Sequence, residues 1–153
     1  MTRLRAFQRL APPLSHLALI IGLAGCAAAP AERVVEVTGT DFAFVAPDTL
    51  SPGATRFRFR RTGTVAHEVA IARVKRGVPL AQVLSAEARG DDTQALYDEG
   101  AGLLYAAITE QAEAELLVDL EPGRQYVLAC TLDENGKPHA MLGMVKAITV
   151  RER

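Results

Sequence analysis

The sequence predicts an all-β fold over residues 33–153, in which short strands pack as a sandwich or a barrel. Apolar and polar residues alternate along several short segments there, which is typical of half-buried strands. Turn signals such as Pro52-Gly53 and Pro122-Gly123 separate these segments. Seven or eight short strands with turns between them are typical of all-β sandwiches and barrels.

The expected strands follow one another from residue 33. Residues 33–38 are rich in valine, residues 40–45 carry Phe42 and Phe44 at a spacing of two, and residues 48–53 contain a turn. In residues 55–61, Phe57 and Phe59 alternate with arginines, so we expect the phenylalanines in the core and the arginines in solvent. Further strands are predicted over residues 68–74, 113–120, 125–130 and 145–150.

One region departs from the strand pattern. Leu80, Val83 and Leu84 are spaced as on a helix, and Pro79 suits the first helical turn. Thr93 is a candidate N-cap for a second short helical piece within residues 93–99. We therefore expect a short helical insertion around residues 77–104 that packs against the sandwich, with no chemistry of its own.

The N-terminus has the features of an export signal. Arg3, Arg5 and Arg9 precede an apolar run over residues 14–25. This run is shorter than the roughly 20 residues that a membrane-spanning helix needs. A short basic segment followed by a short apolar segment is typical of a signal peptide that is removed after export.

The end of that run, Leu23-Ala24-Gly25-Cys26, resembles a bacterial lipobox. The resemblance implies a signal peptide of residues 1–25, a lipid on Cys26 and a tether of residues 26–32. The domain of residues 33–153 is then held at a bacterial membrane, on its periplasmic or cell-surface side. The alternative is an ordinary signal peptide cleaved near Ala29, without the lipid anchor.

The net charge and the cysteine content limit the classes of function that the chain can have. The whole chain has a formal net charge of −1, and loss of the signal removes three arginines, so nucleic acid is not an expected partner. The signal also contains His16, which leaves His67 and His139 as the histidines of the exported domain. Lipidation uses Cys26, so Cys130 has no partner for a disulfide. A lone thiol in an oxidising compartment needs protection, which a metal ion can give.

Four side chains form a candidate metal site. His67 lies upstream, and Cys130, His139 and Met144 follow one another near the C-terminus. Two imidazoles, one thiolate and one thioether are the ligands of a mononuclear blue-copper site, whereas zinc sites rarely use a thioether. Each residue alone is better explained as core packing, so the prediction of one copper ion depends on all four together. Met141 is the alternative thioether ligand.

Two segments resemble the cupredoxin family, the blue-copper proteins of the plastocyanin and azurin type. The segments are Gly63-Thr64-Val65-Ala66-His67-Glu68 and, downstream, Tyr126 to Cys130 with Gly136 to Val145. The resemblance implies a Greek-key β-sandwich of eight strands with copper near one end. The spacing between His139 and Met144 is familiar in that family, which favours Met144 over Met141 as the axial ligand.

The sequence departs from the family pattern at two places. Arg61 stands six residues before His67, where family members usually have an asparagine that helps to lock the ligand loops. The segment between Cys130 and His139 is also longer than in well-known members. Its extra residues 133–136 are polar and are expected to form a turn that bulges outward.

The expected function is the transfer of single electrons between Cu(I) and Cu(II). Four protein ligands leave no open position for a substrate, so we do not expect an enzyme. His139 is the expected electron port, and Ala140, Met141 and Leu142 are expected to form a patch for transient docking of a redox partner. We expect a monomer. Two alternatives remain open: a lipoprotein that delivers or sequesters copper, and a sandwich without metal that serves as an interaction module.

Overall fold

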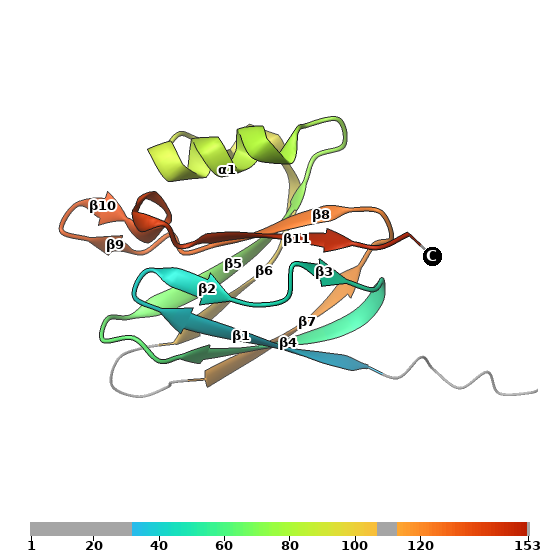
Figure 1. Ribbon diagram of the computed structural model, residues 1–153, viewed down its shortest axis with the longest axis horizontal. Helices are drawn as coiled ribbons and strands as arrows, with labels where there is room; N and C mark the ends of the chain where they lie inside the picture. The colour runs from blue at the N-terminus through green and yellow to red at the C-terminus, as the bar shows by residue number, and fades with distance from the viewer. Residues whose placement is uncertain (1–31, 107–112, 153) are drawn as a thin grey trace, which may run out of the picture.

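Two β-sheets pack face to face, with the main hydrophobic core between them (Figure 1). The computed structural model describes residues 32–106 and 113–152. The predicted signal peptide, Cys26 and almost all of the tether lie outside these residues. The all-β sandwich with one short helix is confirmed. Among the described helices, none combines the length and apolar character needed to cross a membrane.

The first sheet has four strands in the order β2-β1-β4-β7, and the second has five in the order β3-β11-β8-β5-β6. The first comprises β1 (Arg33–Thr40), β2 (Ala43–Val45), β4 (Gly53–Arg61) and β7 (Glu113–Leu120). The second comprises β3 (Thr49–Leu50), β5 (His67–Val74), β6 (Tyr97–Ala106), β8 (Gln125–Ala129) and β11 (Val145–Val150). β1 pairs in parallel with β4, and β3 with β11, whereas the other pairs are antiparallel.

Strand β4 shows how the alternation produces the core. Phe57 and Phe59 are both fully buried between the sheets, as the sequence predicts. Arg58 points to the other face, where its Nε donates to Glu115 of β7 at 2.7 Å. Exposed ion pairs of this kind contribute little to stability, typically below about 1 kcal/mol. The phenylalanines therefore hold the first sheet in place, and the arginines mainly keep its outer face soluble.

Strand β8 is buried on both faces because a helix covers the outer face of its sheet. Tyr126 and Leu128 contribute to the main core, whereas Val127 and Ala129 pack in a second cluster with Val83 of the helix. This helix, α1 (Leu80–Arg89), ends at Gly90, which adopts a left-handed conformation that glycine tolerates best. The predicted helix is confirmed, and it lies over the five-stranded sheet (Figure 1).

The rest of the predicted insertion is different in the structure. The second helical piece is only a 3₁₀ turn, η1 (Gln94–Leu96). Tyr97 already begins β6, which pairs with β5 from Val74↔Tyr97 to His67↔Ala106. Glycines and acidic residues weaken the strand pattern of this segment, so only its long-range pairing with β5 makes it a strand.

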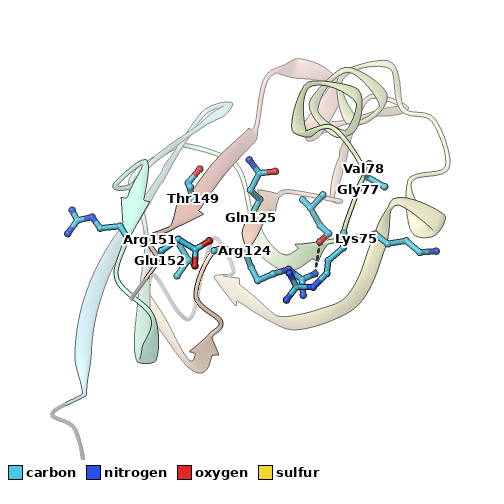
Figure 2. A pocket seen from close by; sticks show the side chains of 12 residues that line it. Lys75, Gly77, Val78, Arg124, Gln125, Thr149, Arg151 and Glu152 are labelled. Atoms are coloured by element: carbon cyan, nitrogen blue, oxygen red, sulfur yellow. Dashed lines mark hydrogen bonds between the residues drawn. The ribbon is translucent and has the colours of Figure 1, made fainter.

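A hollow of about 450 Å³ lies at one end of the sandwich, next to the last residues of β11. Its most buried charge is Arg124, whose Nη2 donates to the carbonyl oxygen of Val74 at 2.9 Å (Figure 2). Arg124 also pairs with Asp98 and Glu121. The guanidinium is thus satisfied within the fold, and the predicted metal ligands lie at the opposite end of the sandwich.

Candidate metal centre

Adjacent strands of the five-stranded sheet carry three of the four predicted ligands. His67 is the first residue of β5, Cys130 directly follows β8, and Met144 directly precedes β11. Both β5 and β11 pair with β8, so the three residues meet at one end of the sheet. The amide of Cys130 donates to the carbonyl oxygen of Met144 at 3.1 Å, which fixes these two residues side by side.

The fourth ligand comes from the connection between β8 and β11. The polar residues before His139 form a small hairpin of β9 (Asp133–Glu134) and β10 (Lys137–Pro138). Asn135 and Gly136 at its tip both have positive φ angles, of 53° and 78°, and an Asn-Gly pair suits such a tight hairpin turn. The predicted polar turn is confirmed, and it projects from the end of the sandwich (Figure 1).

Backbone hydrogen bonds return the chain to Cys130 after this hairpin. His139 begins the 3₁₀ helix η2 (His139–Leu142), and its amide donates to the carbonyl oxygen of Leu132 at 2.7 Å. The amide of Ala140 donates to the carbonyl oxygen of Cys130 at 3.1 Å. The extra residues are thereby accommodated outside the site, and His139 lies beside Cys130.

Three side-chain donor atoms converge within the core. The Nδ1 atoms of His67 and His139 are 3.3 Å apart, and Cys130 Sγ lies 3.3 Å from His139 Nδ1. All three ligand atoms lie within 4.8 Å of one another, and all three residues are buried. Imidazole nitrogens bind first-row metal ions such as zinc at about 2.0–2.1 Å, so one ion can be bonded to both nitrogens and the thiolate. The three residues therefore fit a metal ion.

The two candidate axial ligands, Met144 and Met141, differ in burial. Met144 is fully buried in the same cluster as Cys130. Met141 is 40% exposed, and its sulfur packs close to Gly90 at the end of α1. Burial beside Cys130 agrees with the choice of Met144 as the axial ligand, although the bond itself stays a prediction.

Burial favours the neutral forms of two ligands in the absence of metal. It raises the pKa of the Cys130 thiol above its usual value. Burial, together with the neighbouring His67, lowers the pKa of His139. A neutral imidazole is the form that binds a metal, and a bound cation reverses the penalty on the thiolate. The metal-free pocket thus favours uncharged side chains, and a bound cation would replace the thiol proton.

Asp41 is a site residue that sequence reasoning missed. It lies in the turn between β1 and β2, and its Oδ1 is 2.8 Å from Nε2 of His67. Its carboxylate also accepts hydrogen bonds from the amide and hydroxyl groups of Thr64, which hold the pKa of Asp41 well below its usual value. No sequence signal links Asp41 to His67, because they are 26 residues apart and meet only through the pairing of β1 with β4.

Phe42, the next residue, covers the two imidazoles. Its ring centroid lies 4.8 Å from that of His139 and 6.1 Å from that of His67, in edge-on geometry. The sequence predicts Phe42 as a strand residue, but β2 begins only at Ala43. His139 is 1% exposed, so its ring is not part of the molecular surface.

The loops that present the ligands are held by residues other than the usual asparagine. Arg61, which stands in its place, donates through Nη1 to the carbonyl oxygen of Gly63. Glu68 is buried and accepts a hydrogen bond from the hydroxyl of Thr131, next to Cys130. Its own amide points at Cys130 Sγ, 3.5 Å away. Glu68 therefore has a structural role beside Cys130.

Comparison with known proteins identifies the fold. No family model matches the sequence, and the search of curated proteins also gives no match. Among solved structures, the chain is similar to a dithionite-reduced auracyanin from Roseiflexus castenholzii, with 16% identity, a TM-score of 0.50, and coverage of 76% of this chain and 95% of that one. It is also similar to auracyanin A, a "blue" copper protein from Chloroflexus aurantiacus, with 17% identity, a TM-score of 0.50, and coverage of 79% and 100%.

The molecule is thus a β-sandwich with a buried cluster of two histidines and one cysteine that can hold a metal ion. Its fold is that of the cupredoxins, as the resemblance in the sequence implies. At this level of identity the likeness concerns the fold, and the chemistry of the site has to be argued from its own residues.

Proposed function

We propose that the protein is a type 1 copper protein that carries single electrons. The observation that carries this proposal is the convergence of His67 Nδ1, His139 Nδ1 and Cys130 Sγ in a buried pocket. Met144, fully buried in the same cluster as Cys130, supplies the thioether that completes the set. That one of the similar structures is described as a "blue" copper protein supports the proposal.

The donor set favours copper over other common metals. Thiolate and thioether are soft donors that suit Cu(I), and imidazole suits copper in both oxidation states. A structural zinc site with these residues would have to use Met144 as its fourth ligand, which zinc does not favour. Bound copper would supply a one-electron couple between Cu(I) and Cu(II).

The residues around the site hold the proposed ligands in place and limit the access of water. Strands β5 and β8 hold His67 and Cys130, and the backbone hydrogen bonds of η2 hold His139. Phe42 packs against both imidazoles and limits the access of water. Ligands held on paired strands move little when the charge of the site changes, which is what rapid electron transfer needs.

Redox cycling tests this proposal. We expect the copper-loaded protein to lose its visible colour on addition of one electron per molecule and to regain it on reoxidation, over repeated cycles. The measurement is a spectroelectrochemical titration of the purified protein. Loss of copper on reduction, or failure to regain the colour, would contradict a role as electron carrier.

Delivery or sequestration of copper is the second candidate, and the burial of His139 favours it. An exposed imidazole edge would give a partner direct electronic contact with the site, but His139 is only 1% exposed. The two functions differ in the preferred ion. If Cu(II) gives no intense visible band while Cu(I) binds tightly, copper delivery is the better explanation.

The location and partner follow as further proposals. Export as a lipoprotein anchored through Cys26 is supported by the lipobox-like residues 23–26, which end a basic and then apolar N-terminal segment. A transient docking site is supported by Met141 and Leu142, which are 40% and 39% exposed on the loop that carries His139. Ala140, expected in the same patch, is buried and cannot contribute.

A pair of leucine variants tests the axial ligand. We expect Met144→Leu to raise the reduction potential, because loss of a weak sulfur donor removes more stabilisation from Cu(II) than from Cu(I). Met141→Leu is the matched control, and we expect it to leave the potential unchanged because Met141 lies at the surface. Cyclic voltammetry of both proteins measures the difference. A larger shift for Met141→Leu would reverse the assignment.

A further inference from the structure

The turn between β1 and β2 contacts the ring of His67 through the nitrogen that does not face His139. His67 is fully buried, its Nδ1 faces His139, and its Nε2 lies 2.8 Å from Asp41 Oδ1. The Asp41 side chain is 27% exposed, so its carboxylate lies at the boundary between the site and solvent. The two ring nitrogens of His67 therefore have different partners.

Asp41 acts only as an acceptor in this arrangement. Its Oδ2 accepts from the amide and the hydroxyl of Thr64, both at 2.7 Å, and its Oδ1 accepts from the amide of Val65 at 3.4 Å. Three donors to the two oxygens favour the ionised form of the group, which is therefore a carboxylate. The bond to His67 then requires the proton on Nε2, and a neutral imidazole protonated there has its lone pair on Nδ1.

The neighbouring turn is shaped to fit this carboxylate. A Cβ atom on Gly63 would lie 2.0 Å from Asp41 Oδ1 and 2.9 Å from the backbone nitrogen of Asp41, so no side chain fits there. The carbonyl oxygen of Gly63 is held by Arg61. Because Gly63, Thr64 and Val65 lie only two to four residues before His67, their contacts with Asp41 also fix the position at which β5 begins.

We propose that Asp41 is the positioning residue of the metal centre. It fixes His67 in the tautomer whose Nδ1 is free to bind a metal, and it aims that nitrogen at the site. Its negative charge also favours the more highly charged metal ion. The last statement rests on the proposed copper function, whereas the first two concern the metal-free protein. Carboxylates that accept from the outer nitrogen of a metal-bound histidine act in this way in other metal sites.

The metal-free protein tests the positioning directly. We expect ¹⁵N NMR of the purified protein to show His67 with a protonated Nε2 and an unprotonated Nδ1. In Asp41→Ala we expect this single tautomer to be lost. The control is Asp48→Asn, which removes the charge of an exposed carboxylate that pairs with Lys146. A native protein with His67 protonated on Nδ1, or an unchanged tautomer in Asp41→Ala, would overturn the proposal.

The copper-loaded protein tests the effect of the charge. We expect Asp41→Asn to raise the reduction potential, because removal of a negative charge near the ion destabilises Cu(II) more than Cu(I). We expect Asp41→Ala to bind Cu(II) about 10- to 100-fold more weakly, as is typical for loss of such a partner. A potential that shifts equally in Asp48→Asn would show a general effect of charge and overturn the electrostatic part.

The two measurements separate this proposal from the proposed function. A native protein with the expected tautomer but no copper colour would contradict the copper function and leave the positioning role in place. Should Asp41→Ala not fold, the tautomer of the native protein still decides whether Asp41 holds His67 in the required form.

Discussion

Replacement of Cys130 by serine is expected to abolish the intense visible absorption of the copper-loaded protein. The band of a blue site arises from the bond between Cu(II) and a thiolate, and Cys130 supplies the one thiol within the described cluster. Serine has nearly the same size, so the fully buried position should still pack. Its oxygen is a hard donor that binds Cu(I) poorly, and its hydroxyl is far harder to deprotonate than a thiol.

The matched control is the same substitution at the other cysteine of the chain. Cys26→Ser changes the proposed lipidation site outside the described residues, and we expect the colour of the copper-loaded protein to be retained. Absorption spectra of both variants after addition of one equivalent of Cu(II) make the comparison. Persistence of the band in Cys130→Ser would remove Cys130 from the ligand set.

Truncation of Phe59 is expected to have the largest effect on folding. Phe59 is fully buried, its ring lies 6.2 Å from that of Phe44, and it belongs to the same core cluster as Met144. Phe59→Ala should lower the free energy of unfolding by about 3–5 kcal/mol, since it removes buried apolar surface and leaves a cavity. Urea unfolding of the metal-free protein measures this change.

Two further variants serve as references for the change in the free energy of unfolding. Phe59→Leu keeps most of the buried volume and should be less destabilising than the alanine variant. Val34→Ala removes a 47%-exposed side chain from the neighbouring strand, and its effect should stay within about 0.5 kcal/mol. If Phe59→Ala were no more destabilising than Val34→Ala, the assignment of Phe59 to the core would be wrong.

The sequence predicted the sandwich and its core because alternation is a local signal. Phe57 and Phe59 are spaced to face one sheet surface, and the structure buries both. Strand β6 was missed because its segment lacks a clear local pattern and becomes a strand only through pairing with β5. The helix α1 is predictable because Leu80, Val83 and Leu84 follow helical spacing after Pro79, which suits a first turn.

The metal centre was predictable in its ligands but not in its surroundings. His67, Cys130 and His139 are chemically distinctive side chains, and the structure brings all three together. Asp41 and Phe42 are common residue types in a turn. Their approach to the histidines depends on the parallel register of β1 and β4, in which Gly39 pairs with Arg61. Such a register cannot be deduced from the local sequence.

Titration of the metal-free protein with Cu(II), followed by visible spectroscopy, tests the central claim most directly. We predict an intense thiolate-to-copper band that grows linearly and stops at one copper ion per molecule. The structure accounts for this result, because Cys130 and the two histidines lie close enough to bind one ion together. A protein that binds no Cu(II), or binds it without this band, would contradict the assignment of a blue-copper site.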